Sequence, residues 1–109
     1  MDQKFYDMVE ANPVIAAIKD NDGLEKCCKL EDIKVIFILY GDICSIAEIV
    51  RQVKQSGKLA IVHVDLISGL GIKEIAVDFI RRQTGADGII STKPAMIRRA
   101  KELEMYTIM

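Results

Sequence analysis

The sequence predicts an α/β fold built on a parallel sheet, in the form of a partial (β/α)8 (TIM) barrel. Two observations lead to this prediction. Short apolar runs alternate along the chain with longer segments of helical, 3.6-residue periodicity, and turn residues separate them. The runs are apolar at consecutive rather than alternate positions, which is typical of parallel strands covered by helices. The order of elements therefore reads βαβαβαβαβ, which is about four βα units followed by a fifth strand.

Five apolar runs are the predicted strands, at residues 13–20, 35–42, 58–66, 87–92 and 106–109. The predicted helices between them extend over residues 24–30, 45–55, 72–83 and 94–103. The strand starts recur at intervals of roughly 20 to 29 residues, which suits the repeat of an eight-unit barrel of about 250 residues. No GxGxxG or GxxxxGK[ST] motif follows a strand, so the main sequence argument for a doubly wound nucleotide-binding sheet is missing.

The predicted helix 45–55 has one buried face and two marked ends. Its apolar residues recur at i, i+3, i+4 and i+7, at Ile46, Ile49, Val50 and Val53. Ser45 is the expected N-cap, with Glu48 completing a capping box, and Gly57 suits a left-handed C-terminal stop.

The next two predicted helices repeat this scheme. In helix 72–83 we expect Asp78 to pair with Arg82 and Gly85 to end the helix. In helix 94–103, Pro94 suits the first turn because it has no N–H to leave unsatisfied. The residues expected to face inward are Ile72, Ile75, Ala76, Phe79 and Ile80 in the first helix, and Met96, Ile97, Ala100 and Leu103 in the second.

The composition is that of one globular domain over residues 1–109. Half of the residues are hydrophobic, and 15 Lys and Arg stand against 16 Asp and Glu, which excludes disordered, collagen-like and disulfide-scaffold proteins. The net charge of -1 argues against a general polyanion binder. No secretory or membrane-spanning run is present, so we expect a cytoplasmic protein. Cys27, Cys28 and Cys44 have no metal-ligand spacing and are expected to be reduced.

Polar residues follow each of the first four predicted strands. Ligands bind at the carboxyl ends of strands in parallel α/β folds, so these residues form the candidate ligand rim. Its members are Lys19, Asp20, Tyr40, Gly41, His63, Asp65, Ser91, Thr92 and Lys93, with Asp42 beside them. Such cations and hydroxyl donors suit a small polar or phosphorylated ligand.

His63 and Asp65 are the candidates for acid–base chemistry on this rim. Period-two alternation places them with Ile61 on one face of the strand, and Val62, Val64 and Leu66 on the other. The first face is expected to point into the barrel mouth. No Ser or Cys nucleophile motif and no metal-ligand spacing accompanies the single histidine. We therefore expect a protein that is not an enzyme and that uses no cofactor or metal.

The two halves of the chain differ in charge. Residues 1–55 carry 7 basic and 10 acidic side chains, whereas residues 56–109 carry 8 and 6. Basic residues gather on the last two predicted helices, at Arg81, Arg82, Arg98, Arg99 and Lys101. These residues are candidates for binding RNA phosphates. The alternative is a solvated helix face with cations near helix C-termini.

Several segments together resemble the glycerol-3-phosphate-responsive antiterminator family. They are ANPVIAAIKD, GLEKC, VIFILYGDIC, HVDLISGL, KEIAVDFI, ADGIISTKP and IRRAKEL, in this order over residues 11–109. The resemblance implies a TIM-barrel-like regulator of glycerol-uptake operons. With glycerol 3-phosphate as its effector, such a protein acts at the leader of the mRNA and lets transcription read past a terminator.

The resemblance also implies that the chain is C-terminally truncated and corresponds to the N-terminal half of the family's barrel. Phosphate groups in TIM barrels are often held by the loops after strands seven and eight, which have no counterpart here. The unpaired edges and uncovered interior predict self-association, or a place within a longer chain. The alternatives are a fragment of a TIM-barrel enzyme acting on a small phosphorylated substrate and an inactive structural fragment.

Overall fold

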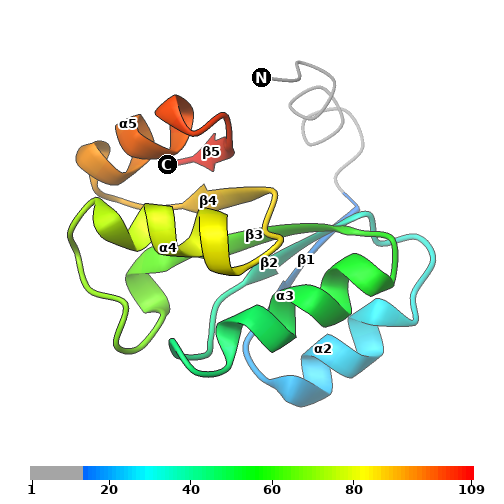
Figure 1. Cartoon of the computed structure of the whole chain (residues 1–109). Helices are drawn as coiled ribbons and strands as arrows, with labels where there is room; N and C mark the ends of the chain where they lie inside the picture. The colour runs from blue at the N-terminus through cyan, green and yellow to red at the C-terminus, as the bar shows by residue number, and fades with distance from the viewer. Residues whose placement is uncertain (1–13) are drawn as a thin grey trace.

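A computed structural model describes residues 14–109, which form one five-stranded parallel sheet (Figure 1). The strands lie in the order of the sequence, β1-β2-β3-β4-β5, and every neighbouring pair is parallel. Their bounds are β1 Ile15–Ile18, β2 Val35–Ile38, β3 Leu59–His63, β4 Gly88–Ile90 and β5 Tyr106–Ile108. The predicted α/β fold with a parallel sheet is confirmed, and the sheet does not close on itself within residues 14–109.

A helix follows each of the first four strands, as the periodicity predicts. The helices are α2 Asn21–Cys28, α3 Ile46–Gln55, α4 Ile75–Gln83 and α5 Pro94–Glu102, and a short 3-10 turn, η1 Val64–Leu66, follows β3. The strands are shorter than the apolar runs that predict them, because the ends of those runs belong to loops, to helix caps and, after β3, to the turn η1. Residue 13, at the start of the first run, lies outside the described residues.

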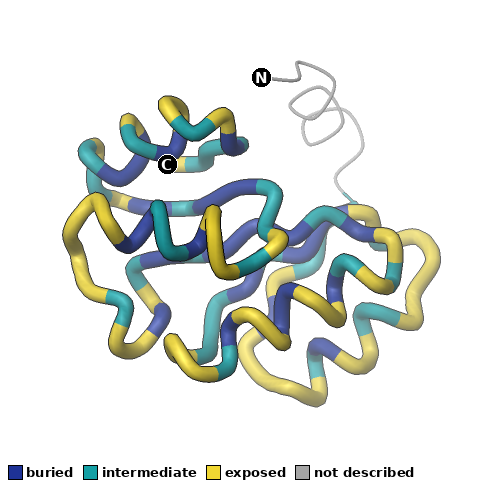
Figure 2. The backbone as a smooth tube through the Cα atoms, viewed as in Figure 1, coloured by how far each residue is buried: buried dark blue, intermediate teal, exposed yellow. Residues whose placement is uncertain are grey.

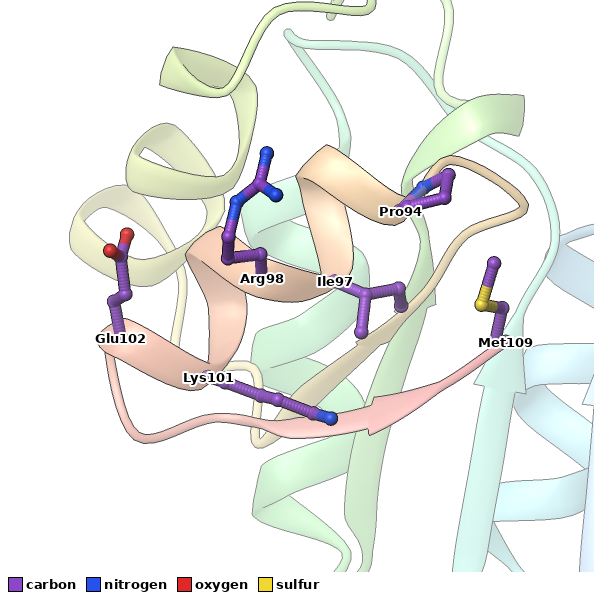
Figure 3. A pocket seen from close by; sticks show the side chains of 6 residues that line it. All are labelled: Pro94, Ile97, Arg98, Lys101, Glu102 and Met109. Carbon is purple, nitrogen blue, oxygen red and sulfur yellow. The ribbon is translucent and has the colours of Figure 1, made fainter.

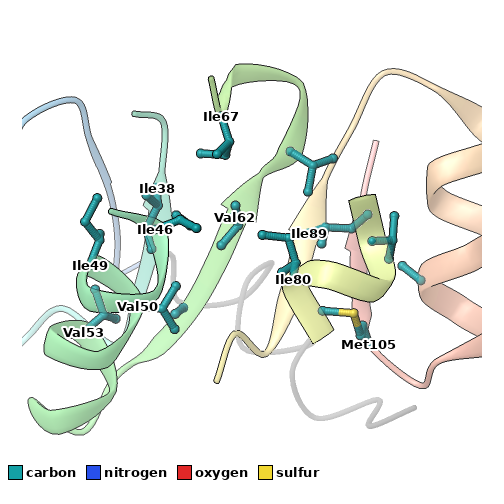
Figure 4. Close-up of a cluster of buried hydrophobic side chains, with 14 of the residues drawn as sticks. Ile38, Ile46, Ile49, Val50, Val53, Val62, Ile67, Ile80, Ile89 and Met105 are labelled. Carbon is teal, nitrogen blue, oxygen red and sulfur yellow. The ribbon is translucent and has the colours of Figure 1, made fainter. Parts of the chain in front are cut away.

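All four helices pack on the same face of the sheet. The residues of this core are buried, and they come from the helices and from alternate positions of the strands (Figures 2 and 4). Ile36 and Ile38 of β2, Val62 of β3, and Ile46 and Val50 of α3 all belong to this cluster. Met96 and Ala100 of α5 and Leu24 of α2 are buried as well. Burial of such side chains contributes about 1.5–3 kcal/mol each to folding.

The opposite face of the sheet is also apolar, and the described core on it is built from strand residues alone. Val35 and Ile61 are buried there. Around them lie half-buried apolar side chains at Ile15, Phe37, Leu59, Ile90, Tyr106 and Ile108. We call this surface the inner face. In a closed barrel the same positions would fill the interior in layers of side chains.

The start of α3 differs from the predicted capping box. Ser45 occupies the N-cap position, but its side chain makes no cap hydrogen bond. Asp42 takes the role instead, since its Oδ1 accepts from the backbone N–H groups of Cys44 at 2.8 Å and Ser45 at 2.9 Å. Ser45 Oγ accepts from the Asp42 N–H at 3.0 Å. At the other end, Gly57 has φ +82°, which confirms the left-handed stop.

The start of α4 also differs from the prediction. The helix begins at Ile75, and both Ile72 and Ile75 are exposed, at 71% and 67% of their surface. The buried residues of α4 are instead Ala76, Val77 and Ile80. The predicted helix begins too early, at residue 72, because apolar loop residues continue the helical spacing.

Two further details of α4 were predicted wrongly. Asp78 hydrogen-bonds to Arg99 of α5 rather than to Arg82 in its own helix. Thr84 is the C-cap, and its hydroxyl donates to the Ile80 carbonyl at 2.7 Å. Gly85 has no positive φ, so the helix does not end in a left-handed glycine. In α5, Pro94 stands in the first turn as predicted.

The partly buried carboxylate of Asp87 connects the amino ends of β3 and β4 to α3. Asp87 precedes β4, and its two carboxylate oxygens accept from Lys54 Nζ at 3.0 and 2.9 Å. Asp87 Oδ2 also accepts from the backbone N–H of Ala60 at 2.8 Å. Because the carboxylate spans a helix and two strands, it fixes α3 against this edge of the sheet.

We predict that Gly88→Ala destabilises the fold. A Cβ at residue 88 would stand 2.6 Å from the Tyr106 carbonyl oxygen and 2.7 Å from Tyr106 Cβ, so β4 and β5 would have to separate. Overpacking of this kind costs about 1–3 kcal/mol, to be measured by urea denaturation. The control is Gly85→Ala, where the nearest atom is Lys54 Cγ at 3.9 Å. Equal stability of the two variants would contradict the prediction.

Candidate functional site

The ends of β1 and β2 hold four of the predicted rim residues. Lys19 is exposed and makes no hydrogen bond or ion pair with any residue of 14–109. Asp20 caps α2, accepting from the Gly23 N–H at 2.7 Å. Tyr40 donates its hydroxyl to Asn21 Oδ1 at 2.7 Å. Burial raises the pKa of Tyr40, and the charges of Asp20 and Cys28 raise it further.

Gly41 shapes the loop after β2. Its φ of +111° lies in a region that side-chain-bearing residues rarely adopt, and a Cβ there would stand 3.0 Å from Ile49 Cδ1. Its carbonyl accepts from the Ser68 N–H at 3.0 Å, and Ile43 N–H donates to the Ser68 carbonyl at 3.0 Å. The loops after β2 and β3 are therefore hydrogen-bonded to one another at this edge of the sheet.

Asp65 connects the end of β3 to the end of β4. Its Oδ1 accepts from Ser91 Oγ at 2.8 Å. Its Oδ2 accepts from the Thr92 N–H at 2.8 Å and from Thr92 Oγ1 at 2.9 Å. Lys93 Nζ lies 3.7 Å from Oδ1, beyond hydrogen-bonding distance but close enough for an ion pair. The structure thus brings together four predicted rim residues through one carboxylate.

The environment of Asp65 favours its ionised form. Burial acts to raise the pKa of this carboxyl. The hydrogen bonds from residues 91 and 92, together with the charge of Lys93, act in the opposite direction and prevail, so the pKa lies below its usual range. A carboxylate held in this state is a poor general acid.

His63 does not form the predicted pair with Asp65. It ends β3 on the inner face, aligned with Ile90 of β4, and no hydrogen bond joins the two side chains. The chain enters the 3-10 turn η1 directly after His63. Strict alternation therefore ends at this residue, which turns Asp65 toward β4 and leaves Leu66 50% exposed.

The Nδ1 atom of His63 is buried and has no hydrogen-bond partner among residues 14–109. A buried polar atom without a partner costs about 1–3 kcal/mol. A ligand hydroxyl or a water molecule that reached this nitrogen would remove that cost. His63 is thus available for ligand contact, whereas Asp65 is already engaged.

The predicted RNA-binding residues are largely engaged with other groups. Arg99 binds Asp78 at 2.7 Å and Glu102 at 3.1 Å. The hydrogen bond to Arg99 lowers the pKa of Asp78 and, in return, raises the pKa of Arg99. Arg98 lies 3.7 Å from Glu74.

The other three predicted RNA-binding residues make fewer side-chain interactions than Arg98 and Arg99. Arg81 donates to the Leu103 carbonyl at 3.4 Å. The side chains of Arg82 and Lys101 make no hydrogen bond or ion pair within residues 14–109 and are exposed.

The predicted RNA-binding residues do not line one common groove. Arg98 and Lys101 line a groove between α5 and the end of β5, together with Ile97 and Met109 (Figure 3). Arg82 lines a second groove, between α3 and α4, with Arg51 and Lys54. The sequence did not reveal this second group, because Arg51 and Lys54 lie far from Arg82 along the chain. Arg81 lines a third groove, with Asp87 and Glu104, so the predicted patch is divided between separate surfaces.

The other sequence-based expectations concern metals, cysteines and membranes. Within residues 14–109 no group of three or more His, Cys, Asp and Glu side chains could hold a metal ion. The three cysteines are free thiols, with Cys44 exposed and Cys27 and Cys28 half-buried. None of the helices in the described part of the chain has the length and hydrophobicity that a membrane crossing requires.

Residues 14–109 match the sequence profile of the family described as "Glycerol-3-phosphate responsive antiterminator". A curated relative, the Escherichia coli (strain K12) protein YgcP, is described as uncharacterized. It is 46% identical over 101 residues, which are 93% of this chain and 52% of the relative.

Two solved structures are similar to this chain. The glycerol uptake operon antiterminator regulatory protein of Listeria monocytogenes matches with a TM-score of 0.82 and 29% identity, over 88% of this chain and 52% of that one. A glycerol uptake operon antiterminator-related protein of Thermotoga maritima matches with a TM-score of 0.75 and 33% identity, over 85% and 51%. The chain therefore spans about half the length of the proteins that it matches. The likeness confirms a TIM-barrel-like fold, of which the described part is an open section.

Proposed function

Since the chain belongs to the glycerol-3-phosphate-responsive antiterminator family, we propose that it takes part in transcription antitermination at glycerol-uptake operons. In this proposal it responds to glycerol 3-phosphate and acts on the leader mRNA. The match over residues 14–109 is the observation that carries the proposal. Its test is transcription in vitro from a template with a glycerol-operon leader. Read-through that needs both this chain and glycerol 3-phosphate is the expected result.

We place the effector at the carboxyl ends of the strands. Lys19 and Lys93 supply two ammonium groups at this edge, and His63 supplies a ring nitrogen without a hydrogen-bond partner among residues 14–109. Cations are the natural partners of a phosphate dianion, and the ring nitrogen suits a glycerol hydroxyl. Ser91 is fully buried and already bonded to Asp65, so its contribution is to the shape of the rim rather than to direct contact.

The geometry favours binding over catalysis at this rim. A general acid and a general base would have to share a reacting group, whereas Asp65 is turned away from His63 and bonded to Ser91 and Thr92. The enzyme alternative predicts turnover of a triose or glycerol phosphate that disappears in His63→Ala. Binding without turnover is the outcome that our proposal requires.

We predict that glycerol 3-phosphate binds this 109-residue chain no more tightly than millimolar, as measured by calorimetry. Two or three side-chain hydrogen bonds to a charged group contribute about 1.5–3 kcal/mol each, and the association cost of roughly 4–15 kcal/mol offsets most of that gain. Lys93→Ala should weaken binding further because it removes a cation. Lys29→Ala, which removes the partner of Glu25 on α2, is the control. A micromolar dissociation constant would show that the whole phosphate site lies within these residues.

For the RNA contact we propose the basic residues of α4 and α5. Arg82 and Lys101 contribute most in this proposal, since Arg99 is bonded to two carboxylates and Arg98 lies 3.7 Å from one, in an exposed and weak ion pair. We predict that Arg82→Ala and Lys101→Ala each reduce the slope of log affinity against log salt by about 1 in leader-RNA binding. Lys29→Ala again serves as the control. An unchanged slope in both variants would remove these residues from the RNA contact.

We also propose that the inner face is covered in the active protein, by a second copy of this chain or by further chain of the same fold. Phe37, Leu59 and Ile90 are only half-buried on this face, and such apolar surface favours association. For the 109-residue chain we predict concentration-dependent self-association in sedimentation at micromolar concentration. Phe37→Gln should shift it toward the monomer, and Ile75→Gln, on the exposed start of α4, should not. A wild-type chain that stays monomeric would contradict this.

A further inference from the structure

The Asp65 carboxylate receives an unusual concentration of hydrogen bonds from one short segment. Three donors, one from Ser91 and two from Thr92, reach it at 2.8 to 2.9 Å. Its side chain is 12% exposed. Hydrogen bonds to a charged acceptor are stronger than those between neutral groups. The carboxylate is therefore the main restraint on the segment that joins β4 to α5.

The restraint continues beyond the residues that touch the carboxylate. Ser91 Oγ donates to Asp65 and at the same time accepts from the Lys93 N–H at 3.0 Å. Lys93 is the N-cap residue of α5, and Pro94 follows in the first turn. One chain of hydrogen bonds thus runs from Asp65 through Ser91 to the backbone at the start of α5.

This arrangement positions the Lys93 ammonium group and leaves it accessible to a ligand. It lies 3.7 Å from Asp65 Oδ1, and its side chain remains 41% exposed. An ion pair at that distance and exposure is weak. A phosphate dianion carries more negative charge than the Asp65 carboxylate, so it would compete with Asp65 for the Lys93 ammonium group.

We propose that Asp65 is a positioning residue for a phosphate-bearing effector: it orders residues 91–93 and presents the Lys93 ammonium to the ligand without touching the ligand itself. This inference rests on the proposed binding of glycerol 3-phosphate at the rim. It makes a counterintuitive prediction. Removal of a negative charge beside a dianion site would strengthen binding by electrostatics alone, whereas loss of the positioning residue weakens it.

The test is titration of the full 109-residue chain with glycerol 3-phosphate, followed by NMR chemical shifts, which report millimolar affinities. Asp65→Asn should raise the dissociation constant about fivefold, equivalent to about 1 kcal/mol. The same substitution in a Lys93→Ala background should change it less than twofold, because coupled residues are non-additive. Asp78→Asn, which loses the bonds to Arg99 away from the rim, is the matched control.

A second measurement covers variants that fold poorly. Thr92→Ala removes one of the three donors and leaves the Thr92 N–H in place. Backbone amide exchange at residues 92 and 93 should become faster in this variant and in Asp65→Asn, but not in Asp78→Asn. Tighter binding by Asp65→Asn, or an equal loss with and without Lys93, would overturn the positioning role. If the wild-type chain shows no shift with glycerol 3-phosphate, the proposed function itself fails, and the positioning role for an effector fails with it.

Discussion

A parallel sheet whose strands are apolar on both faces has to be covered on both faces. In this chain the four helices cover one face and bury alternate residues of every central strand, such as Ile36 and Val62. The inner face keeps its own apolar set around Val35 and Ile61. This constraint agrees with the TIM-barrel-like fold of the similar solved structures, in which the chain is about twice as long as this one.

One aspartate connects neighbouring elements at the amino ends of the strands, and a second aspartate does the same at the carboxyl ends. At the amino edge, Asp87 accepts from Lys54 and from the Ala60 N–H, and so fixes α3 against β3 and β4. At the carboxyl edge, Asp65 binds Ser91 and Thr92 and fixes the start of α5. The first contributes stability alone. The second lies among the rim residues, so the same physical device also shapes a surface on which a ligand can bind.

The sequence predicted the order and type of the elements well, because apolar runs and helical spacing reflect burial directly. It failed where a side chain's partner is chosen by tertiary contacts. Ser45 has the right residue type for a capping box, yet Asp42 three residues earlier caps the helix better. His63 and Asp65 share a predicted face only if the strand continues, and η1 ends that alternation.

The limits of prediction at the rim have the same cause. The residue types of Lys19, Ser91 and Lys93 pointed to this edge, because parallel strands bring their carboxyl ends together. Which of them are engaged and which are available could not be read from the sequence. That division depends on one carboxylate, Asp65, reaching residues 26 and 27 positions away.

Ion pairs with carboxylates also determine which basic side chains of residues 56–109 are available to bind a partner. Arg99 is the most tightly held cation, bonded to Asp78 and Glu102 at 2.7 and 3.1 Å. A phosphate that approached it would have to displace two carboxylates, and each would then lose its partner. Arg82 and Lys101 carry no such cost within the described residues. The basic face that a count of residues suggests is thus reduced to a few separated charges, and an RNA bound here has to reach across α4 and α5 to contact both.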